Sequence, residues 1–274
     1  MAEKMVSSYT DREILYNHII NTSPDAKDFD LHTHDICELI FLKKGDVSGV
    51  ISGKVYKLQR HDLIIFRSGV LHGINIDNDA EYERINILFD EKVIANRAFE
   101  KVSGDIDVIN YSGNEYMIDI FKKMDLYYKN FSGNDLKRLI TNLIEEIIFN
   151  LTLVQNESNG PAFVDSIVDR AIEFIDNNYT KQIGVEDICN KLYISKSHLH
   201  HLFTDKLHIS PKKYINLQRL AMARKMIRNG RKPYDVYFEC GFKDYATFYR
   251  NYKLHFGHIP SMEMETEIER KIKS

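Results

Sequence analysis

Cysteine is scarce in this sequence of 274 residues, and its distribution excludes some classes of protein. The three cysteines, Cys37, Cys189 and Cys240, are far apart and odd in number. This pattern argues against a disulfide framework or a zinc knuckle, and it fits reduced thiols in a cytoplasm.

Long hydrophobic runs are also missing. No apolar stretch approaches the roughly 18 residues that a membrane-spanning helix needs. The N-terminal segment "MAEKMVSSYTDREILYN" lacks the apolar core and the small-residue cleavage site of a secretion signal. We therefore expect a cytoplasmic protein with no membrane partner.

Charge is distributed unevenly along the chain. Hydrophobic residues make up 43 % and charged residues 28 %, as in soluble globular proteins, and the length suffices for two ordinary domains. Residues 181–260 contain 15 Lys and Arg against 6 Asp and Glu, which is a local net charge of +9. Because the whole chain has a net charge of −3, the remaining residues carry a net charge of −12. A basic segment joined to an acidic body suggests a module that binds a polyanion.

The N-terminal part has the pattern of a β-domain. Short β-rich runs, among them "HDLIIFRSGVLHGINI" and "YERINILF", lie between residues 29 and 90 and are separated by glycines. We expect a sandwich or a barrel.

From about Tyr116 the hydrophobic period becomes helical, and two amphipathic helices are expected. They cover the apolar face of the barrel or, in the alternative interpretation, form a dimer seam. The segment "QNESNGPA", residues 155–162, is the best candidate for a linker. The apolar stripes consist of Met117, Ile120, Phe121, Met124 and Tyr128 in the first helix, and Leu136, Leu139, Ile140, Leu143, Ile144, Ile147 and Ile148 in the second.

The basic half contains an internal repeat. "SKSHLHHLFTDKLHISP" begins at Ser195 and "DYATFYRNYKLHFGHIP" begins at Asp244, an offset of 49 residues. Both segments start with a residue that can cap a helix, and both end near a proline. Each follows another short helix and a tight turn, which is the helix-turn-helix arrangement.

A longer helix connects the two units over residues 211–230. Its apolar positions follow one stripe, its lysines and arginines supply charge, and Asn229-Gly230 ends it. If both units bind one face of DNA, their half-sites should lie about one helical turn apart, roughly 10 base pairs.

Residues from about 164 to 262 resemble the DNA-binding domain of the AraC/XylS family of bacterial transcription regulators. The segment "RKPYDVYFECGFKDYATFYRNYKLHFGHIP" and the helix "QRLAMARKMI" carry the resemblance. The sequence departs from the family pattern at Tyr237, where a small residue is usual, and at His208, which replaces a glycine that Gly257 preserves in the second copy.

The resemblance implies which residues read DNA. Base-facing positions fall on Ser197, His200 and His201 in the first unit and on Tyr245, Ala246, Tyr249 and Arg250 in the second. Lys196, Lys243 and Lys253 are expected to contact phosphates. Among these residues Arg250 is the strongest candidate, because a guanidinium can bind guanine O6 and N7 together.

The N-terminal domain carries a second motif. His32, His34 and Glu38 form H-x-H-x-x-x-E, six residues precede Gly45, and His72 follows in "RSGVLH". This pattern resembles the two motifs of the cupin β-barrel superfamily, with His61 and Arg67 at positions where the superfamily usually has glycine and proline.

The cupin resemblance implies three uses for this cluster. His32, His34, Glu38 and His72 fill the metal-ligand positions of the superfamily, and such donors suit Fe, Mn, Ni, Cu or Zn. In AraC-type regulators the same positions commonly bind a polar effector or stabilise the barrel without a metal. Arg67 is included as an effector-binding residue, with Glu81, Arg84 and Asn86 as further polar candidates.

We expect an α+β chain of two domains. Its parts are a cupin-like effector-binding barrel (1–110), two amphipathic helices for barrel cover or dimerisation (111–154), a linker (155–163), and a C-terminal all-α AraC-type DNA-binding domain with two helix-turn-helix motifs joined by a linker helix (164–274).

The expected function is sequence-specific transcription regulation controlled by a small molecule, with a sugar or sugar derivative as the favoured effector, and without enzymatic activity. The alternatives are a cupin metalloenzyme of dioxygenase or isomerase type fused to a DNA-binding domain, or a regulator without effector. No cofactor is expected, a divalent metal ion being the alternative. The expected partners are double-stranded DNA, the effector and a second copy of the chain, and RNA polymerase is a further candidate.

Overall fold

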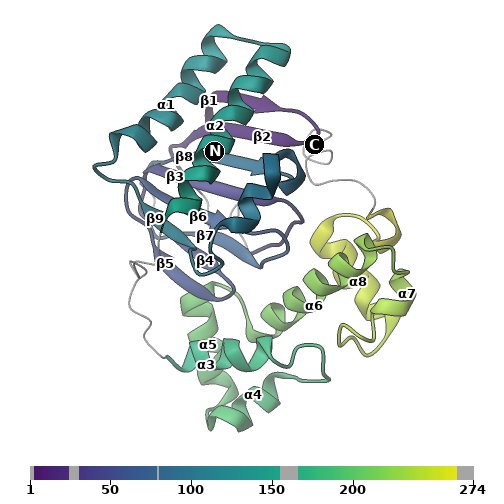
Figure 1. Cartoon of the computed structure of the whole chain (residues 1–274). Helices are drawn as coiled ribbons and strands as arrows, with labels where there is room; N and C mark the ends of the chain where they lie inside the picture. The colour runs from purple at the N-terminus through teal and green to yellow at the C-terminus, as the bar shows by residue number, and fades with distance from the viewer. Residues whose placement is uncertain (1–2, 25–30, 79, 155–165, 264–274) are drawn as a thin grey trace.

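The computed structural model describes residues 3–24, 31–78, 80–154 and 166–263. Within these residues an antiparallel β-domain is followed by two long helices and then by a helical half (Figure 1). The expected linker at 155–163 lies outside the described residues. No helix in the described ranges has the length and apolarity that crossing a membrane requires.

The β-domain contains two antiparallel sheets. The larger has the strand order β1-β2-β8-β3-β6-β9, and the smaller has the order β5-β4-β7. The strands of the described chain are β1 (Glu3–Thr10), β2 (Ile14–Asn21), β3 (Cys37–Lys44), β4 (Val47–Ile51), β5 (Lys54–Lys57), β6 (Asp62–Phe66), β7 (His72–Ile76), β8 (Tyr82–Phe89) and β9 (Val108–Asn110).

Strands β1 and β2 extend the large sheet beyond the region where the sequence predicts strands. Strand β2 pairs along its whole length with β8, from Ile14 opposite Phe89 to Asn21 opposite Tyr82. Strand β1 forms the sheet edge and has a register shift between Met5 and Ser7.

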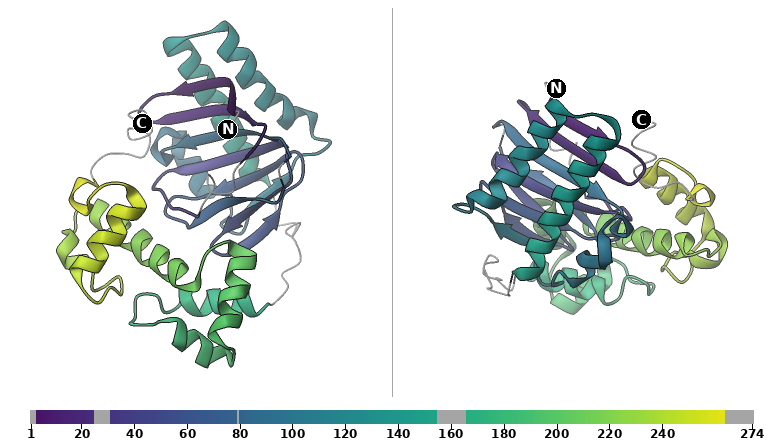
Figure 2. Two further views of the ribbon diagram at one scale, coloured as in Figure 1. Left: turned by 180° about the vertical axis from the view of Figure 1, so that it is seen from behind. Right: turned by 45° about the horizontal axis from the view of Figure 1, so that its top comes forward.

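Two helices cover the outer face of the large sheet (Figure 2). Helix α1 (Glu115–Asn130) begins at Asn114, whose side chain accepts a hydrogen bond from the Met117 amide, and α2 (Gly133–Leu153) follows. Their apolar stripes pack with Leu39, Phe41 and other outward side chains of the sheet in one core. The prediction of two amphipathic helices is confirmed, and their stripes cover the β-domain. Two stripe residues are exceptions, because Tyr128 is exposed and Leu139 is only half-buried.

The inner faces of the two sheets share a second core, formed by residues that alternate with the outward ones. Its buried members are Ile40, Leu42, Val47, Ile51, Leu58, Ile64, Phe66, Ile74 and Tyr82. The 3-10 helices η2 (Glu91–Val93) and η3 (Ala95–Lys101) follow β8, and Ala98 and Phe99 of η3 belong to the outer core.

The helical half consists of two small groups joined by a long helix (Figure 1). Its elements are α3 (Ile167–Asp176), α4 (Val185–Leu192), α5 (Lys196–Leu207), α6 (Pro211–Arg228), α7 (Pro233–Val236), α8 (Tyr245–Phe256) and η4 (Pro260–Met262). The N-terminal end of α6 packs with α3, α4 and α5, and its C-terminal end packs with α7 and α8. Helix α6 therefore belongs to both groups and spaces them.

The predicted helix caps are present. The side chains of Ser195 and Asp244 accept hydrogen bonds from the amides of His198 and Thr247, at the starts of α5 and α8. Both helices end at a residue in the left-handed region, His208 at φ 55° and Gly257 at φ 75°. A glycine adopts this conformation without strain, whereas histidine adopts it at a small cost in backbone strain. His208, which replaces the glycine of the family pattern, therefore keeps the same helix end.

The helical half contacts the β-domain directly. Leu31, Val50 and Leu71 share a buried cluster with Ile172 and its neighbours on α3. Gly53 has a φ of +78°, and a Cβ at this position would lie 2.5 Å from Cδ1 of Ile172. The close approach therefore requires glycine at the turn between β4 and β5.

Candidate functional site

The four residues of the predicted cluster lie together although they come from three segments. His32 and His34 lie in the loop before β3, Glu38 is the second residue of β3, and His72 begins β7. Two backbone hydrogen bonds join His32 and His72, of 2.8 Å and 2.9 Å. One potential ligand atom from each of the four side chains lies within 4.8 Å of all the others.

The backbone orients two of the imidazoles. Nδ1 of His34 lies 2.9 Å from the carbonyl oxygen of Ile36, and Nδ1 of His72 lies 2.8 Å from that of Val70. A carbonyl only accepts, so each Nδ1 donates a hydrogen bond and each Nε2 faces away from the backbone that holds its ring.

The two Nε2 atoms converge on each other and on a carboxylate. The Nε2 atoms of His34 and His72 are 3.1 Å apart, and Oε2 of Glu38 lies 3.0 Å and 3.5 Å from them. Burial lowers the pKa of His72, which favours its neutral ring. A metal cation bound here could be contacted by both imidazole nitrogens and by the carboxylate oxygen.

Polar side chains of β8 lie beside the cluster on the inner face. In the β3–β8 register Glu38 is opposite Leu88, and Ile40 is opposite Asn86. Directly opposite residues of antiparallel strands project to the same side. Asn86 Oδ1 is buried and has no hydrogen-bond partner among the described residues. The inner face therefore offers polar contacts next to the histidines.

Tyr82 is a residue of this face that sequence reasoning missed. Its ring is buried in the inner core, and the guanidinium carbon of Arg84 lies 4.6 Å from the ring centroid. Burial and the charge of Glu38 raise the pKa of Tyr82 to about 12, against the effect of Arg84. The alternation of Tyr82, Arg84 and Asn86 in "YERINILF" is the signal that could have identified it.

Arg67 does not belong to the four-residue cluster, and its role as an effector-binding residue stays a prediction. Its guanidinium donates to the carbonyl oxygens of Ser103 and Ile106, at 2.6 Å and 3.0 Å, and lies 3.4 Å from Asp107. The preceding residue, Phe66, stacks on the His72 ring at 4.3 Å between centroids. Because side chains alternate along an extended segment, Arg67 projects to the opposite side.

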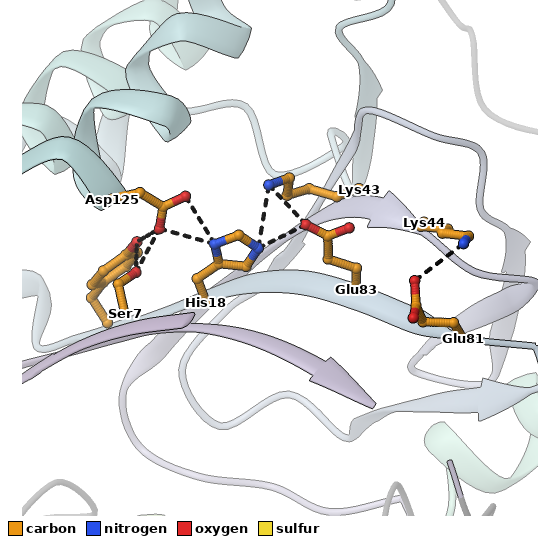
Figure 3. A network of polar contacts seen from close by, with 8 residues as sticks. Ser7, His18, Lys43, Lys44, Glu81, Glu83 and Asp125 are labelled. Atoms are coloured by element: carbon orange, nitrogen blue, oxygen red, sulfur yellow. Dashed lines mark hydrogen bonds and ion pairs between the residues drawn. The ribbon is translucent and has the colours of Figure 1, made fainter. Parts of the chain in front are cut away.

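A separate buried polar network attaches α1 to the large sheet (Figure 3). Nδ1 of His18 lies 2.9 Å from both carboxylate oxygens of Asp125 on α1, and Nε2 lies 2.9 Å from Glu83. Ser7 and Tyr16 also donate to Asp125, at 2.5 Å and 2.8 Å. The network connects β1, β2 and β8 to one carboxylate of the covering helix.

In the first helical group, the residues expected to read DNA are accessible. Ser197, His200 and His201 are exposed on α5, whereas Leu199 and Phe203 of the same helix are buried. Lys196 is exposed at the first position of α5 and pairs with Glu186 of α4.

In the second group, the corresponding residues differ in exposure. Ala246 and Arg250 are exposed on α8, whereas Tyr245 and Tyr249 are half-buried. The two tyrosine rings contact each other, with centroids 6.2 Å apart, and Tyr245 also contacts the ring of Tyr237. Tyr237, which departs from the family pattern, is thus accommodated in an aromatic group. Lys243 and Lys253 are exposed.

Arg219 of α6 lies where the two helical groups meet. Its guanidinium donates to the carbonyl oxygens of Tyr179, Lys181 and Ile183, at 2.7 Å, 2.9 Å and 3.1 Å. Gly241 lies so close that a Cβ there would be 2.5 Å from the Tyr179 oxygen and 2.8 Å from Nε of Arg219. The loop before α4 and the turn before α8 therefore meet at one buried guanidinium.

Comparison with known proteins matches both halves of the chain. Residues 19–98 match the AraC-like ligand binding domain, and residues 188–265 match a helix-turn-helix domain. The two matches cover 80 and 78 residues, or 158 of the 274 residues together.

Relatives match over long stretches. An uncharacterized HTH-type transcriptional regulator of Bacillus subtilis, YbfI, is 26 % identical over 223 residues, which are 79 % of this chain and 80 % of that protein. The lactose operon transcription activator of Staphylococcus xylosus is 29 % identical over 147 residues, 51 % of this chain and 50 % of that protein.

Among solved structures, the AraC-like transcriptional activator CuxR is 13 % identical and has a TM-score of 0.43, covering 87 % of this chain and 85 % of that one. The matched domains and relatives are those of transcription regulators, not of enzymes. The chain therefore belongs to the AraC/XylS family of DNA-binding transcription regulators and carries an AraC-like ligand-binding domain.

Proposed function

We propose that the chain regulates transcription by binding two DNA half-sites with α5 and α8, under the control of a small molecule bound at the His32, His34, Glu38 and His72 cluster. The observation that supports it most is the repeated unit of N-cap, helix and left-handed end at α5 and α8, with α6 as spacer. In this proposal each pair, α4–α5 and α7–α8, is a helix-turn-helix unit. The proposal also keeps the predicted domain boundaries, with the effector-binding domain ending at residue 110, the two covering helices at 154 and the linker at 163.

The roles of the DNA-facing residues follow from their exposure. Ser197, His200, His201, Ala246 and Arg250 are accessible for contacts with base edges. The half-buried rings of Tyr245 and Tyr249 can meet thymine methyl groups at the margin of the helix. Lys196, Lys243 and Lys253 would neutralise phosphates and add salt dependence to binding.

Replacing Arg250 with alanine tests the DNA-binding role. We expect binding to a specific duplex to weaken by about 1–3 kcal/mol, because the bidentate contact with guanine is lost. The duplex is obtained by selection from a random pool with the purified full chain, and fluorescence anisotropy measures its Kd and that of a scrambled duplex. Binding to the scrambled duplex should change little.

Lys253→Ala is the matched control on the same helix. If Lys253 contacts a phosphate, its loss should weaken binding to both duplexes about equally. The slope of log Kd against log salt concentration should also fall by roughly one. Equal losses on both duplexes for Arg250→Ala would instead make Arg250 a phosphate contact, and failure to select any duplex would contradict the proposed function.

A sugar or sugar derivative is the effector that we propose. The supporting features are the convergent imidazole nitrogens, the Glu38 carboxylate and the buried Asn86 oxygen, which can exchange hydrogen bonds with hydroxyl groups. The relative from Staphylococcus xylosus is named as an activator of a lactose operon, and this supports the same class.

A divalent metal ion is the second candidate for the cluster. The donor atoms fit a metal site, because three imidazoles and one carboxylate converge and the Nδ1 hydrogens of His34 and His72 are held by backbone carbonyls. A bound cation would neutralise the carboxylate of Glu38 and fix the loop that carries His32 and His34.

Zinc titration of His72→Ala tests this candidate. The wild-type chain should bind one equivalent of Zn²⁺. Loss of a residue that only hydrogen-bonds to a metal ligand weakens metal binding by roughly 10- to 100-fold, and His72→Ala should weaken it by more, because it removes a ligand itself. Calorimetry measures both values. His201→Ala, which removes an exposed histidine of the helical half, is the control and should leave the affinity unchanged. Absence of stoichiometric binding would remove the metal from the proposal, leaving the sugar.

We also propose that two copies of the chain associate through the outward side of α1 and α2. Large apolar side chains are exposed there in addition to the stripes that cover the sheet. They are Tyr116, Leu126, Tyr128, Phe131, Phe149 and Leu153. RNA polymerase is a further proposed partner, to which no residues are assigned.

A further inference from the structure

Two arginines of α6 bind the loop that carries His32 and His34. Nη1 of Arg224 donates to the carbonyl oxygen of Thr33 at 2.9 Å, and Arg228 forms an ion pair with Asp35. Thr33 lies between the two histidines in sequence, and Asp35 follows the second of them. Helix α6, which joins the two groups of the helical half, thus contacts the loop of the proposed effector site.

One buried carboxylate completes the contact. Both Nε atoms, of Arg224 and of Arg228, donate to Oε1 of Glu263 at 2.8 Å, and Tyr252 of α8 donates to its other oxygen. Arg224 and Glu263 are 3 % and 2 % exposed. The guanidinium of Arg224 also lies over the Phe256 ring, 4.5 Å from its centroid. The cluster therefore joins the loop, α6 and α8.

Such a cluster favours two discrete states over intermediate ones. A charge buried without its partner is costly, so loss of one contact leaves another charge uncompensated. When the loop withdraws, Arg224 and Arg228 keep their bonds to Glu263 but lose the Thr33 carbonyl and the Asp35 carboxylate. A small displacement of the loop is then converted into a change in the packing of α6.

The loop cannot move at His34 without moving at its neighbours. Consecutive Cα atoms are about 3.8 Å apart, and the peptide unit between them is rigid. The His34 carbonyl accepts from the Gly69 amide at 2.7 Å, and His32 is paired to His72 on both sides. A ligand that displaces the backbone at His32 or His34 therefore also displaces the Thr33 carbonyl oxygen and Asp35.

We propose that Asp35, Arg224, Arg228 and Glu263, with the Thr33 carbonyl, form an interdomain lock that transmits the state of the effector site to the second DNA-binding unit. The proposal rests on the proposed function, since it names how that site regulates DNA binding. The lock couples two sites through one element with two states, which is the physical requirement for allostery.

The first test measures the Kd of the selected duplex for full-length Asp35→Asn, Arg228→Gln and the double variant. Each single substitution should change the Kd by about tenfold, in the same direction, as expected for an allosteric coupling. Because both open one lock, the double variant should change it no more than the larger single effect. Asp46→Asn is the control, because Asp46 pairs with Lys57 within the β-domain. It should leave the Kd within about twofold.

The second test needs neither DNA nor effector. Hydrogen exchange of the His32 and Gly69 amides should accelerate by about tenfold in Arg228→Gln, because both amides are bonded within or against the released loop. They should be unchanged in Asp46→Asn. Asparagine is nearly isosteric with Asp35, and Asp35→Asn should show the same acceleration if Arg228→Gln folds poorly.

The outcomes separate the lock from the function on which it rests. If the chain selects no duplex, the proposed function fails, and exchange alone decides whether the lock exists. If a duplex is selected, but the two substitutions multiply in the double variant or leave the Kd unchanged, the lock does not transmit and the inference is overturned. Unchanged exchange in both variants overturns it as well.

Discussion

Replacing Glu263 with alanine should lower the free energy of unfolding of the helical half by about 3–5 kcal/mol, the cost of breaking a buried ion pair by removing one partner. Arg224 and Arg228 both donate to Glu263, and Arg224 is almost fully buried. Without the carboxylate, these charges and the Tyr252 hydroxyl lose their common acceptor. Urea unfolding followed by circular dichroism measures the difference.

Glu239→Ala is the matched control for this substitution. Glu239 forms a bidentate pair with Arg231 on the surface of the same half, with bonds of 2.6 Å and 2.8 Å. Its side chain is 48 % exposed, so its loss should cost much less than the loss of Glu263. Equal effects of the two substitutions would show that Glu263 is not held as a buried charge.

The contribution of Glu263 should also depend on pH. Burial opposes its ionisation, but the charge of Arg224 and hydrogen bonds from Tyr252, Arg224 and Arg228 outweigh burial and lower its pKa to about 2. The folded-state pKa lies below the ordinary value of 4.5, so ionised Glu263 stabilises the fold above that pH. This stabilisation is lost as the pH falls through about 2.

Replacing Asp125 with alanine should destabilise the β-domain by about 3 kcal/mol, because several buried donors lose one acceptor. Ser7, Tyr16 and His18 all bond Asp125, and each is at most 3 % exposed. The substitution also removes the polar attachment of α1 to the sheet. Urea unfolding at pH 7 measures the change.

Asp119→Ala on the same helix is the control for Asp125→Ala. Asp119 pairs with Lys122 and its side chain is 55 % exposed, so its loss should change the stability by less than about 0.5 kcal/mol. A loss at Asp125 no larger than this would contradict the importance of the network.

Asp125→Asn isolates the charge of the network. Burial raises the pKa of Asp125, but hydrogen bonds from His18, Ser7 and Tyr16 outweigh burial and lower it to about 2, from an ordinary value of 3.8. Ionised Asp125 therefore stabilises the fold above pH 3.8, and the stabilisation is lost as the pH falls through about 2. The difference between wild type and Asp125→Asn should be largest near neutral pH and shrink below about pH 4.

Features that depend on neighbouring residues were predictable. The stripes of α1 and α2 follow from the helical period, and the starts of α5 and α8 follow from Ser195 and Asp244. The spacing of His32, His34 and Glu38 and the second motif that ends in His72 indicated the cluster, and the structure brings all four residues together. In each case the signal lies within a few residues or in a short motif.

Features that depend on distant segments were not predictable. Strand β1 was missed because its sequence, "EKMVSSYT", has a weak β-pattern and is stabilised by pairing with β2. Tyr128 continues the apolar stripe in sequence, but it is exposed in the last turn of α1 and does not cover the sheet. Arg224 has the pattern of a charge on an exposed helix face, yet it is buried against the β-domain.

The sequence by itself determined the two-part organisation, the helices with their caps, the basic character of the C-terminal half and the residues of the cluster, because periodicity, capping and motif spacing are local properties. Only the tertiary structure decided that Arg67 faces away from the cluster, that Tyr82 is buried on the inner face, and that Arg224 binds Thr33 across 191 positions of the chain. The physical reason is that the burial of a side chain and its hydrogen-bond partners depend on which distant segments pack together in the folded chain. A local sequence pattern does not specify those contacts.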